Sequence, residues 1–367
     1  MKPLLSTSFL TLLLLATPAT AQLSLTPPAA TPSPAPEKPK DNSKENSKEK
    51  SAAKPHAITK KKEAAPAPKP SASPSPPPAA TVIPAPATDN SNADLVYGAY
   101  QRGQYKTAFD LATARAQTGD PKAMTMLGQL YSNALGIKRD YAKANEWYKR
   151  ASDAGDRQAM LELAMMRMAG RGGPVDKGDA VKLLASSAKL GEPKAAYNLA
   201  LLYLDGQTLP QDVKRSAELL RQAADAGLPE AQYALATFYK EGTGVPKDIE
   251  RAVRLLQAAS LADNVDAEVE YAIALFNGTG TPKNMPAAVA MLRKAARQNS
   301  PIAQNRLALV LINGMGTQAD KIEGFKWHLV AKTGGKGDPD LDKQLADLPP
   351  EDRAKAEAAA KKWLGTK

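Results

Sequence analysis

Few residues in this chain of 367 amino acids belong to types that could perform chemistry. Cysteine is absent, which excludes a disulfide scaffold, a thiolate zinc site, a cysteine nucleophile and a lipidated N-terminal cysteine. The two histidines are His56 and His328, and His56 lies in a proline-rich stretch. A histidine-based metal site or a Ser-His-Asp triad would therefore rest on one residue. We expect no catalytic residue, no metal ligand and no cofactor, and we predict that the protein is not an enzyme.

Two recurring motifs could be taken for active-site elements. Pairs such as Gly242 and Gly244 have the Gly-x-Gly spacing of some phosphate-binding loops, but neither a preceding strand nor a Walker motif accompanies them. Recurring aspartates could suggest paired catalytic carboxylates, but successive members stand one repeat apart. Their periodicity favours turns for the glycines and helix N-caps for the aspartates, at Asp140, Asp176, Asp212, Asp248 and Asp320, with Asn284 completing the series.

Methionine and the second histidine offer two further candidates. Thioethers can bind Cu(I), but they also fill irregular cores and adaptable grooves. We interpret the methionines as packing or groove-lining residues: Met124, Met126, Met160, Met165, Met166 and Met168. His328 takes the place of leucines at the same repeat position, so we expect it to be partly buried beneath a C-terminal cap.

The elements that position these residues repeat every 36 residues without an insertion, which is typical of stacked repeat proteins. Alanine recurs at six positions, and an apolar residue followed by Gly or Ala stands four and five residues later, on the same face of a helix. The alanines are Ala123, Ala159, Ala195, Ala231, Ala267 and Ala303. Each unit reads as two helices with two apolar faces, and neighbouring units must stack to bury both.

These spacings resemble the Sel-like repeat (Sel-one type), a branch of the tetratricopeptide superfamily. In the first unit Ala123, Leu127, Tyr131, Asp140 and Gly155 fall at the positions of the motif; the further matches are Gly128, Gly136, Lys143, Ala144, Trp147, Tyr148 and Ala151. The second and third units depart from it at Arg167 and Thr208, and we expect an altered local turn at such positions. The resemblance implies an all-α fold, a right-handed α-solenoid of 36-residue hairpins that binds other proteins.

Residues outside the periodic region predict five parts in the chain. An apolar run from Leu4 to Ala16 followed by Ala19-Thr20-Ala21 predicts a signal peptide, residues 1–21, cleaved after Ala21, and hence a periplasmic protein. Residues 22–88 hold ten lysines, five acids and no Phe, Trp or Tyr, and this composition predicts a disordered Pro/Lys/Ala-rich tail over residues 22–90. We assign residues 91–119 to an N-terminal capping hairpin, 120–335 to six repeats and 336–367 to C-terminal capping helices.

Variable polar residues on the first helix of each unit are the candidate partner-binding residues. The resemblance implies that this helix lines the concave face of the solenoid. Residues on its side away from the Ala-Leu-Gly positions should then point into the groove. The candidates fall at two repeat positions seven residues apart, and they are Glu162, Asn198, Asp205, Glu241, Glu270 and Arg306.

Three functions follow from these observations. The first is an exported, non-catalytic scaffold or regulator that binds a protein partner on the concave face. The second is a tether, in which the basic tail makes weak contacts with peptidoglycan or another anionic envelope polymer. The third is a cell-wall-related hydrolase, for which the sequence shows no constellation of reactive residues. We expect no nucleic-acid partner, because export separates the protein from nucleic acid and no aromatic residues are interleaved with the lysines. The sequence leaves the oligomeric state open.

Overall fold

The computed structural model describes residues 94–365, and within them it contains 16 helices and no strand. The predicted signal peptide (1–21), the predicted tail (22–90) and the next three residues (91–93) lie outside the described residues. The helices are α1 (Leu95–Gln101), α2 (Tyr105–Gln117), α3 (Pro121–Asn133), α4 (Tyr141–Asp153), α5 (Arg157–Ala169), α6 (Lys177–Lys189), α7 (Pro193–Asp205), α8 (Val213–Asp225), α9 (Pro229–Glu241), α10 (Ile249–Leu261), α11 (Val265–Asn277), α12 (Met285–Arg297), α13 (Pro301–Ile312), α14 (Lys321–Thr333), α15 (Pro339–Ala346) and α16 (Pro350–Gly365).

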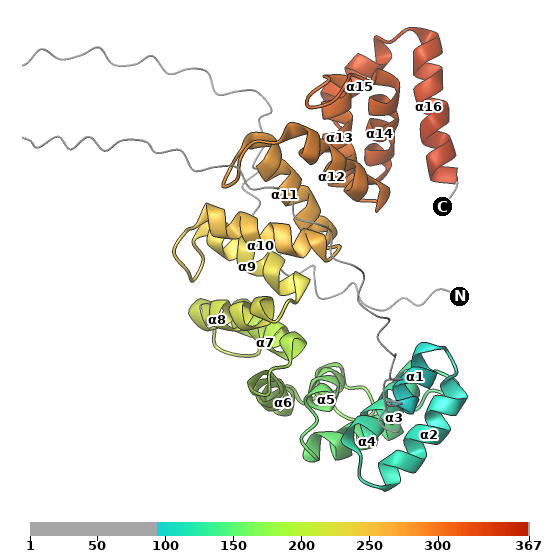
Figure 1. The fold of residues 1–367 in the computed structure, drawn as a ribbon, viewed down its shortest axis with the longest axis vertical. Helices are drawn as coiled ribbons and strands as arrows, with labels where there is room; N and C mark the ends of the chain where they lie inside the picture. Colours follow the sequence, from blue (N-terminus) through green and yellow to red (C-terminus); the bar gives the residue numbers. More distant parts are fainter. Residues whose placement is uncertain (1–93, 366–367) are drawn as a thin grey trace, which may run out of the picture. The chain divides into compact units, whose positions relative to one another are not determined.

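From α1 to α14 each helix packs against the next one in the chain, as Figure 1 shows. Odd-numbered α3–α13 each pair with the following even-numbered helix, and that helix packs against the next pair. Each unit therefore needs its neighbours to cover its second apolar face, as the periodic pattern predicts. This architecture confirms the expected all-α solenoid of helical hairpins.

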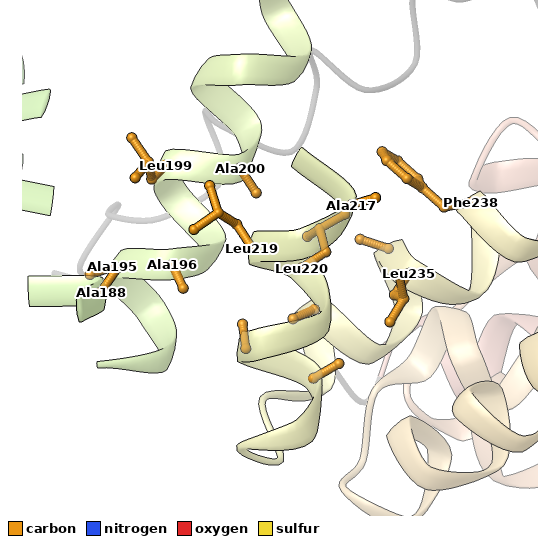
Figure 2. Packing of buried hydrophobic residues seen from close by; sticks show 14 of the residues in the cluster. Ala188, Ala195, Ala196, Leu199, Ala200, Ala217, Leu219, Leu220, Leu235 and Phe238 are labelled. Carbon is orange, nitrogen blue, oxygen red and sulfur yellow. The ribbon is translucent and has the colours of Figure 1, made fainter. Parts of the chain in front are cut away.

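Small residues make the close contact between helices possible. The alanines at 123, 159, 195, 231, 267 and 303 are all at most 2% exposed. Figure 2 shows Leu199 and Ala200 of α7 beside Leu219 of α8, in an apolar cluster that runs from α5 to α11. At these positions a larger side chain would push the paired helices apart, so the recurrence of alanine follows from the spacing of the helices.

Gly128 shows the same principle most sharply. A Cβ atom at this position would lie 2.5 Å from the Tyr148 ring of α4. The other repeats have Ala here, and their outer helices carry Leu or His in place of Tyr148. The first repeat therefore accommodates a larger ring by removing the facing methyl group.

The recurring Asp residues cap the even-numbered helices, which confirms the structural interpretation of that series. The side chain of Asp248 accepts a hydrogen bond from the backbone N–H of Arg251 at 2.8 Å. Five equivalent residues cap their helices in the same way, each accepting from the amide three residues later: Asp140, Asp176, Asp212, Asn284 and Asp320. Each satisfies an amide that has no partner within its helix.

The Gly-x-Gly pairs form turns, as their periodicity predicts. Gly242 ends α9 with φ of 82°, and Gly244 has φ of 66°. A Cβ atom on Gly244 would lie 2.7 Å from the carbonyl oxygen of Val213, at the start of the preceding outer helix. In the third repeat Thr208 stands at this position and does not have a positive φ, so that turn differs, as we expected.

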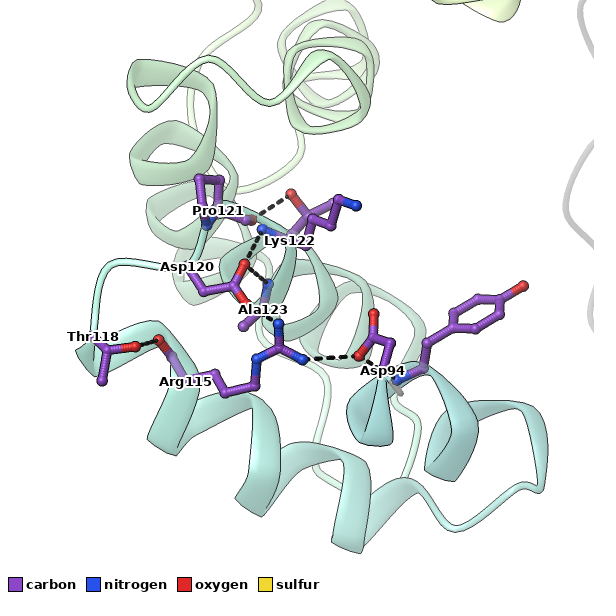
Figure 3. Close-up of polar contacts among 9 residues, drawn as sticks. Asp94, Arg115, Thr118, Asp120, Pro121, Lys122 and Ala123 are labelled. Atoms are coloured by element: carbon purple, nitrogen blue, oxygen red, sulfur yellow. Dashed lines mark hydrogen bonds and ion pairs between the residues drawn. The ribbon is translucent and has the colours of Figure 1, made fainter. Parts of the chain in front are cut away.

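Both ends of the repeat array carry additional helices. Arg115 of α2 forms ion pairs with Asp94, at 3.0 Å, and with Asp120, and so links α1, α2 and the start of α3 (Figure 3). At the other end α16 packs against α14. Trp327 and Trp363 meet edge to face there, with ring centroids 5.0 Å apart.

His328 lies at this C-terminal end and is fully buried, rather than partly buried as we expected. Its Nε2 atom is 2.9 Å from Oδ1 of Asp342 on α15, and the same carboxylate accepts hydrogen bonds from Lys332. The hydrogen bond between His328 and Asp342 therefore connects α14 to α15, and α15 lies against the buried imidazole.

The methionines are divided among separate apolar clusters. Met126 and Met166 are buried in two different clusters, while Met165 and Met168 pack against a third. This distribution fits their interpretation as packing residues.

Candidate partner-binding face

The candidate residues lie on the first helix of each repeat. We call α3, α5, α7, α9, α11 and α13 the inner helices, and α4, α6, α8, α10, α12 and α14 the outer helices. Figure 1 shows α5 and α7 on the inner side of the curve that α3–α8 follow, with α6 and α8 outside them. We number repeat positions from residues 121, 157, 193, 229, 265 and 301, so that each inner helix begins at position 1.

Positions 2, 6, 9 and 13 form one stripe along each inner helix, because they are separated by four, three and four residues. In α7 these positions are Lys194, Asn198, Leu201 and Asp205, and all four are half-buried or exposed. Leu199, one position away from the stripe, is buried against the outer helix. We call these four positions on the six inner helices the inner face.

Electrostatic effects show that side chains of successive inner helices influence one another on this face. Burial raises the pKa of Glu162 on α5, while a hydrogen bond from Gln158, at 3.0 Å, and the charge of Lys194 on α7 act in the opposite direction. Burial lowers the pKa of Arg306 on α13, and Asp338, beyond the last repeat, opposes that shift. Position 6 of one unit is thus coupled to position 2 of the next.

The six predicted residues are spread over α5, α7, α9, α11 and α13, so they form a row and not a compact cluster. Glu162, Asn198, Glu270 and Arg306 are half-buried, whereas Asp205 and Glu241 are exposed at the ends of their helices.

Two of the predicted residues also have local roles. Asn198 donates to the carbonyl of Lys194 at 2.7 Å, and Asp205 accepts from the amide of Gln207 at 2.8 Å. These bonds occupy part of the hydrogen-bonding capacity of both side chains.

The prediction missed the residues at positions 2 and 5. Burial raises the pKa of Tyr233 on α9, and the negative charges of Glu270, Asp266 and Glu241 raise it further. Tyr197 on α7 is affected in the same way by burial and by Glu230. Position 2 lies one helical turn before position 6, so the spacing used to find Glu270 would also have found Asp266.

Within residues 94–365 no three His, Asp or Glu side chains are placed to hold a metal ion. The carboxylates of the inner face follow one another along the stack, each on its own turn of helix. In the same part of the chain, no helix is both long enough and apolar enough to cross a membrane.

Comparison with known proteins identifies the family of this repeat array. The model of the Sel1 repeat matches six consecutive segments, which are residues 121–156, 157–192, 193–228, 229–264, 265–300 and 301–335. These segments cover more than half of the 367 residues, and the chain belongs to the Sel1 repeat family. Proteins of this family are generally non-catalytic scaffolds that bind protein partners. A comparison of the sequence with curated proteins gave no match.

One solved structure with the same fold agrees with this assignment, and a second, more distant one is similar to part of this chain. A Sel1 repeat protein from Oxalobacter formigenes is 25% identical with a TM-score of 0.59, and the match covers 65% of this chain and 98% of that one. The protein c5321, described as a protective antigen of uropathogenic Escherichia coli with an SLR fold, is 22% identical with a TM-score of 0.47; the match covers 71% of this chain and 64% of that one.

Proposed function

We propose that this protein is an exported, non-catalytic scaffold that holds a segment of a partner protein against the inner face, in the periplasm. The apolar run Leu4–Ala16 and the small residues Ala19 and Ala21 support export. Family membership supports a protein partner.

One observation carries the assignment to the inner face. The residues that hold the helices together are the same small or apolar types in nearly every repeat, while the inner-face residues differ in charge and size. Position 6, for example, holds the half-buried residues Glu162, Asn198, Glu270 and Arg306, and the buried residues Met126 and Ala234. A constant framework that presents a varied, half-exposed surface can recognise a specific partner without changing its fold.

Pull-down of the mature, tagged protein from envelope extract tests this function with two matched variants. Glu241→Lys/Glu270→Lys reverses two acids on inner helices, and Glu218→Lys/Glu250→Lys reverses two exposed acids on outer helices. We expect a discrete partner to be recovered by the wild type and the outer variant and lost from the inner variant, with all three showing the same helical circular dichroism. Equal recovery by both folded variants would contradict binding on the inner face.

The ten lysines of residues 22–90 favour a second candidate, a tether to anionic envelope polymers. Each lysine near such a surface contributes about 1 kcal/mol, and salt weakens the attraction. Sedimentation with purified peptidoglycan should then depend on residues 22–88 and fall at high salt, and sedimentation that survives their deletion would exclude the tether.

A further inference from the structure

Negative charge is concentrated on one part of the inner face. Of its positions in the fourth and fifth repeats, four carry acids, Glu230 and Glu241 on α9 and Asp266 and Glu270 on α11. The whole chain has a net charge of +11, so this segment has the opposite sign to the protein as a whole. Basic residues of the inner face lie on both sides of this segment, Lys122 and Lys194 before it and Arg306 after it.

Most of this negative charge has no internal counter-ion. Among residues 94–365, only one of the four acids, Glu270, forms an ion pair with a basic side chain. Its partner is Lys240, whose Nζ atom is 3.1 Å from Oε2 of Glu270. The pKa of Asp266 is raised by burial and by the charge of Glu270, which shows that the two carboxylates repel each other. A cation brought to this segment would relieve that repulsion.

Aromatic and aliphatic groups lie on the same side of the same helices. Tyr197 and Tyr233 are half-buried at position 5, beside the acids, and Leu201 and Ile273 are half-buried at position 9. A tyrosine ring attracts an ammonium or guanidinium group over its face, and the long stems of Lys and Arg pack on apolar side chains. The surface therefore matches both parts of a long basic side chain.

The protein already contains one example of such a contact. Lys240 extends from α9 to the carboxylate of Glu270 on the next inner helix, 30 residues later in the sequence. Its ammonium group shows that a lysine side chain can be placed between adjacent inner helices at this segment.

We infer that the acidic segment of the inner face on α9 and α11, with Tyr197 of α7 at its edge, binds a lysine- or arginine-rich segment of the partner protein. This inference rests on the proposed function and adds the chemistry of the partner. The acids at positions 2, 6 and 13 bind the cationic groups, and the tyrosines at position 5 pack against them. The charge gives the selectivity, because an acidic segment would be repelled by the same four carboxylates.

Fluorescence anisotropy with synthetic peptides tests the inference on the mature full-length protein. The probe is a labelled peptide of three copies of Lys-Ala-Arg-Ser, and the control is its acidic counterpart, three copies of Glu-Ala-Asp-Ser. We expect the basic peptide to bind, more weakly as salt is raised, and the acidic peptide not to bind.

Matched neutral variants locate the binding site. Glu230→Gln/Asp266→Asn removes two charges from the segment with little change in shape, and Glu218→Gln/Glu250→Gln removes two from outer helices. Loss of two partly exposed charge contacts should weaken the basic peptide roughly tenfold in the first variant and leave the second near wild type. Equal binding by both variants, or equal binding of both peptides, overturns the inference.

Two results separate this inference from its alternatives. If the inner charge-reversal variant loses the envelope partner but no basic peptide binds the wild type, the proposed function stands and the basic chemistry is wrong. Sedimentation equilibrium measures whether the protein self-associates, and so tests whether a second copy of this chain binds the acidic segment. Self-association that disappears in Glu230→Gln/Asp266→Asn would assign the segment to that copy and overturn the inference.

Discussion

We call the buried contact between paired helices, where the alanines of position 3 lie, the helix seam. The helix seam and the inner face lie on different sides of the same inner helices, and they follow different rules. At position 3 all six repeats have alanine, at most 2% exposed, while at position 6 the residues range from alanine to arginine. The seam tolerates only residues that fit a fixed distance between helices, because packing there is dense. On the inner face only Met126 and Ala234 are buried among the position-6 residues, so most of the face is free to serve recognition. Stability and binding should therefore separate by position within one helix.

Truncation of a leucine should separate the two regions most strongly. Leu220 is 1% exposed between α8 and its neighbours, whereas Leu201 is half-buried on the inner face. We expect Leu220→Ala to lower the free energy of unfolding by about 2–5 kcal/mol because it leaves a cavity. Leu201→Ala should cost much less. Urea unfolding followed by circular dichroism measures both, and similar losses would show that the face is part of the core.

The Gly128–Tyr148 contact offers a second test of the seam. Gly128→Ala should destabilise the protein by about 1–3 kcal/mol, because the added methyl group collides with the tyrosine ring. Gly128→Ala combined with Tyr148→Leu recreates the Ala–Leu pair that stands in the next repeat as Ala164 and Leu184. The double variant should be more stable than the sum of the two single changes predicts. Strict additivity in the same unfolding assay would mean that the ring does not require the glycine.

Removal of an N-cap should have a smaller effect. Asp248→Ala leaves the amide of Arg251 without its partner and should cost about 1 kcal/mol. Asp248→Asn should be nearly neutral, since Asn284 caps the equivalent helix of the next repeat. Thermal unfolding of the three proteins gives the order, and a loss for Asn as large as that for Ala would contradict capping by the side-chain oxygen.

The smallest effect is expected from Glu162, and it depends on pH. Burial raises the pKa of this acid in the folded state, so the folded protein binds the proton more tightly than the unfolded chain does. The ionised form is then destabilising at neutral pH, and stability is gained as the pH falls through the folded-state pKa. Glu162→Gln should unfold at a higher temperature than wild type at pH 7, and the difference should vanish at a pH below both pKa values. If the difference in unfolding temperature between the two proteins does not change with pH, burial of the Glu162 charge is not its cause.

Sequence alone gave most of the framework, because the framework repeats. The Asp248 cap, the turn at Gly242 and the buried alanines each recur with one spacing, so local rules for helices and turns were sufficient. The ends were harder to predict. Full burial of His328 depends on Asp342 and α15, which lie outside the repeat pattern.

The inner face was predicted only in part, for a physical reason. Its residues vary, so periodicity does not single them out, and the pairing of Lys240 with Glu270 depends on the distance between neighbouring inner helices. Tyr233 was missed because it is half-buried at the boundary between the buried and exposed sides of α9. At such a position the spacing alone does not decide whether a side chain belongs to the core or to the inner face.

Site-specific photo-crosslinking tests the central claim, that the inner face and not the outer surface binds the partner. A photoreactive amino acid replaces Thr237 on the inner face of α9 in one protein, and exposed Arg254 on the outer helix α10 in another. Irradiation in the native envelope should produce a crosslinked partner band with the substitution at position 237 and none with that at 254. A band of the same mass from position 254 alone would contradict the account.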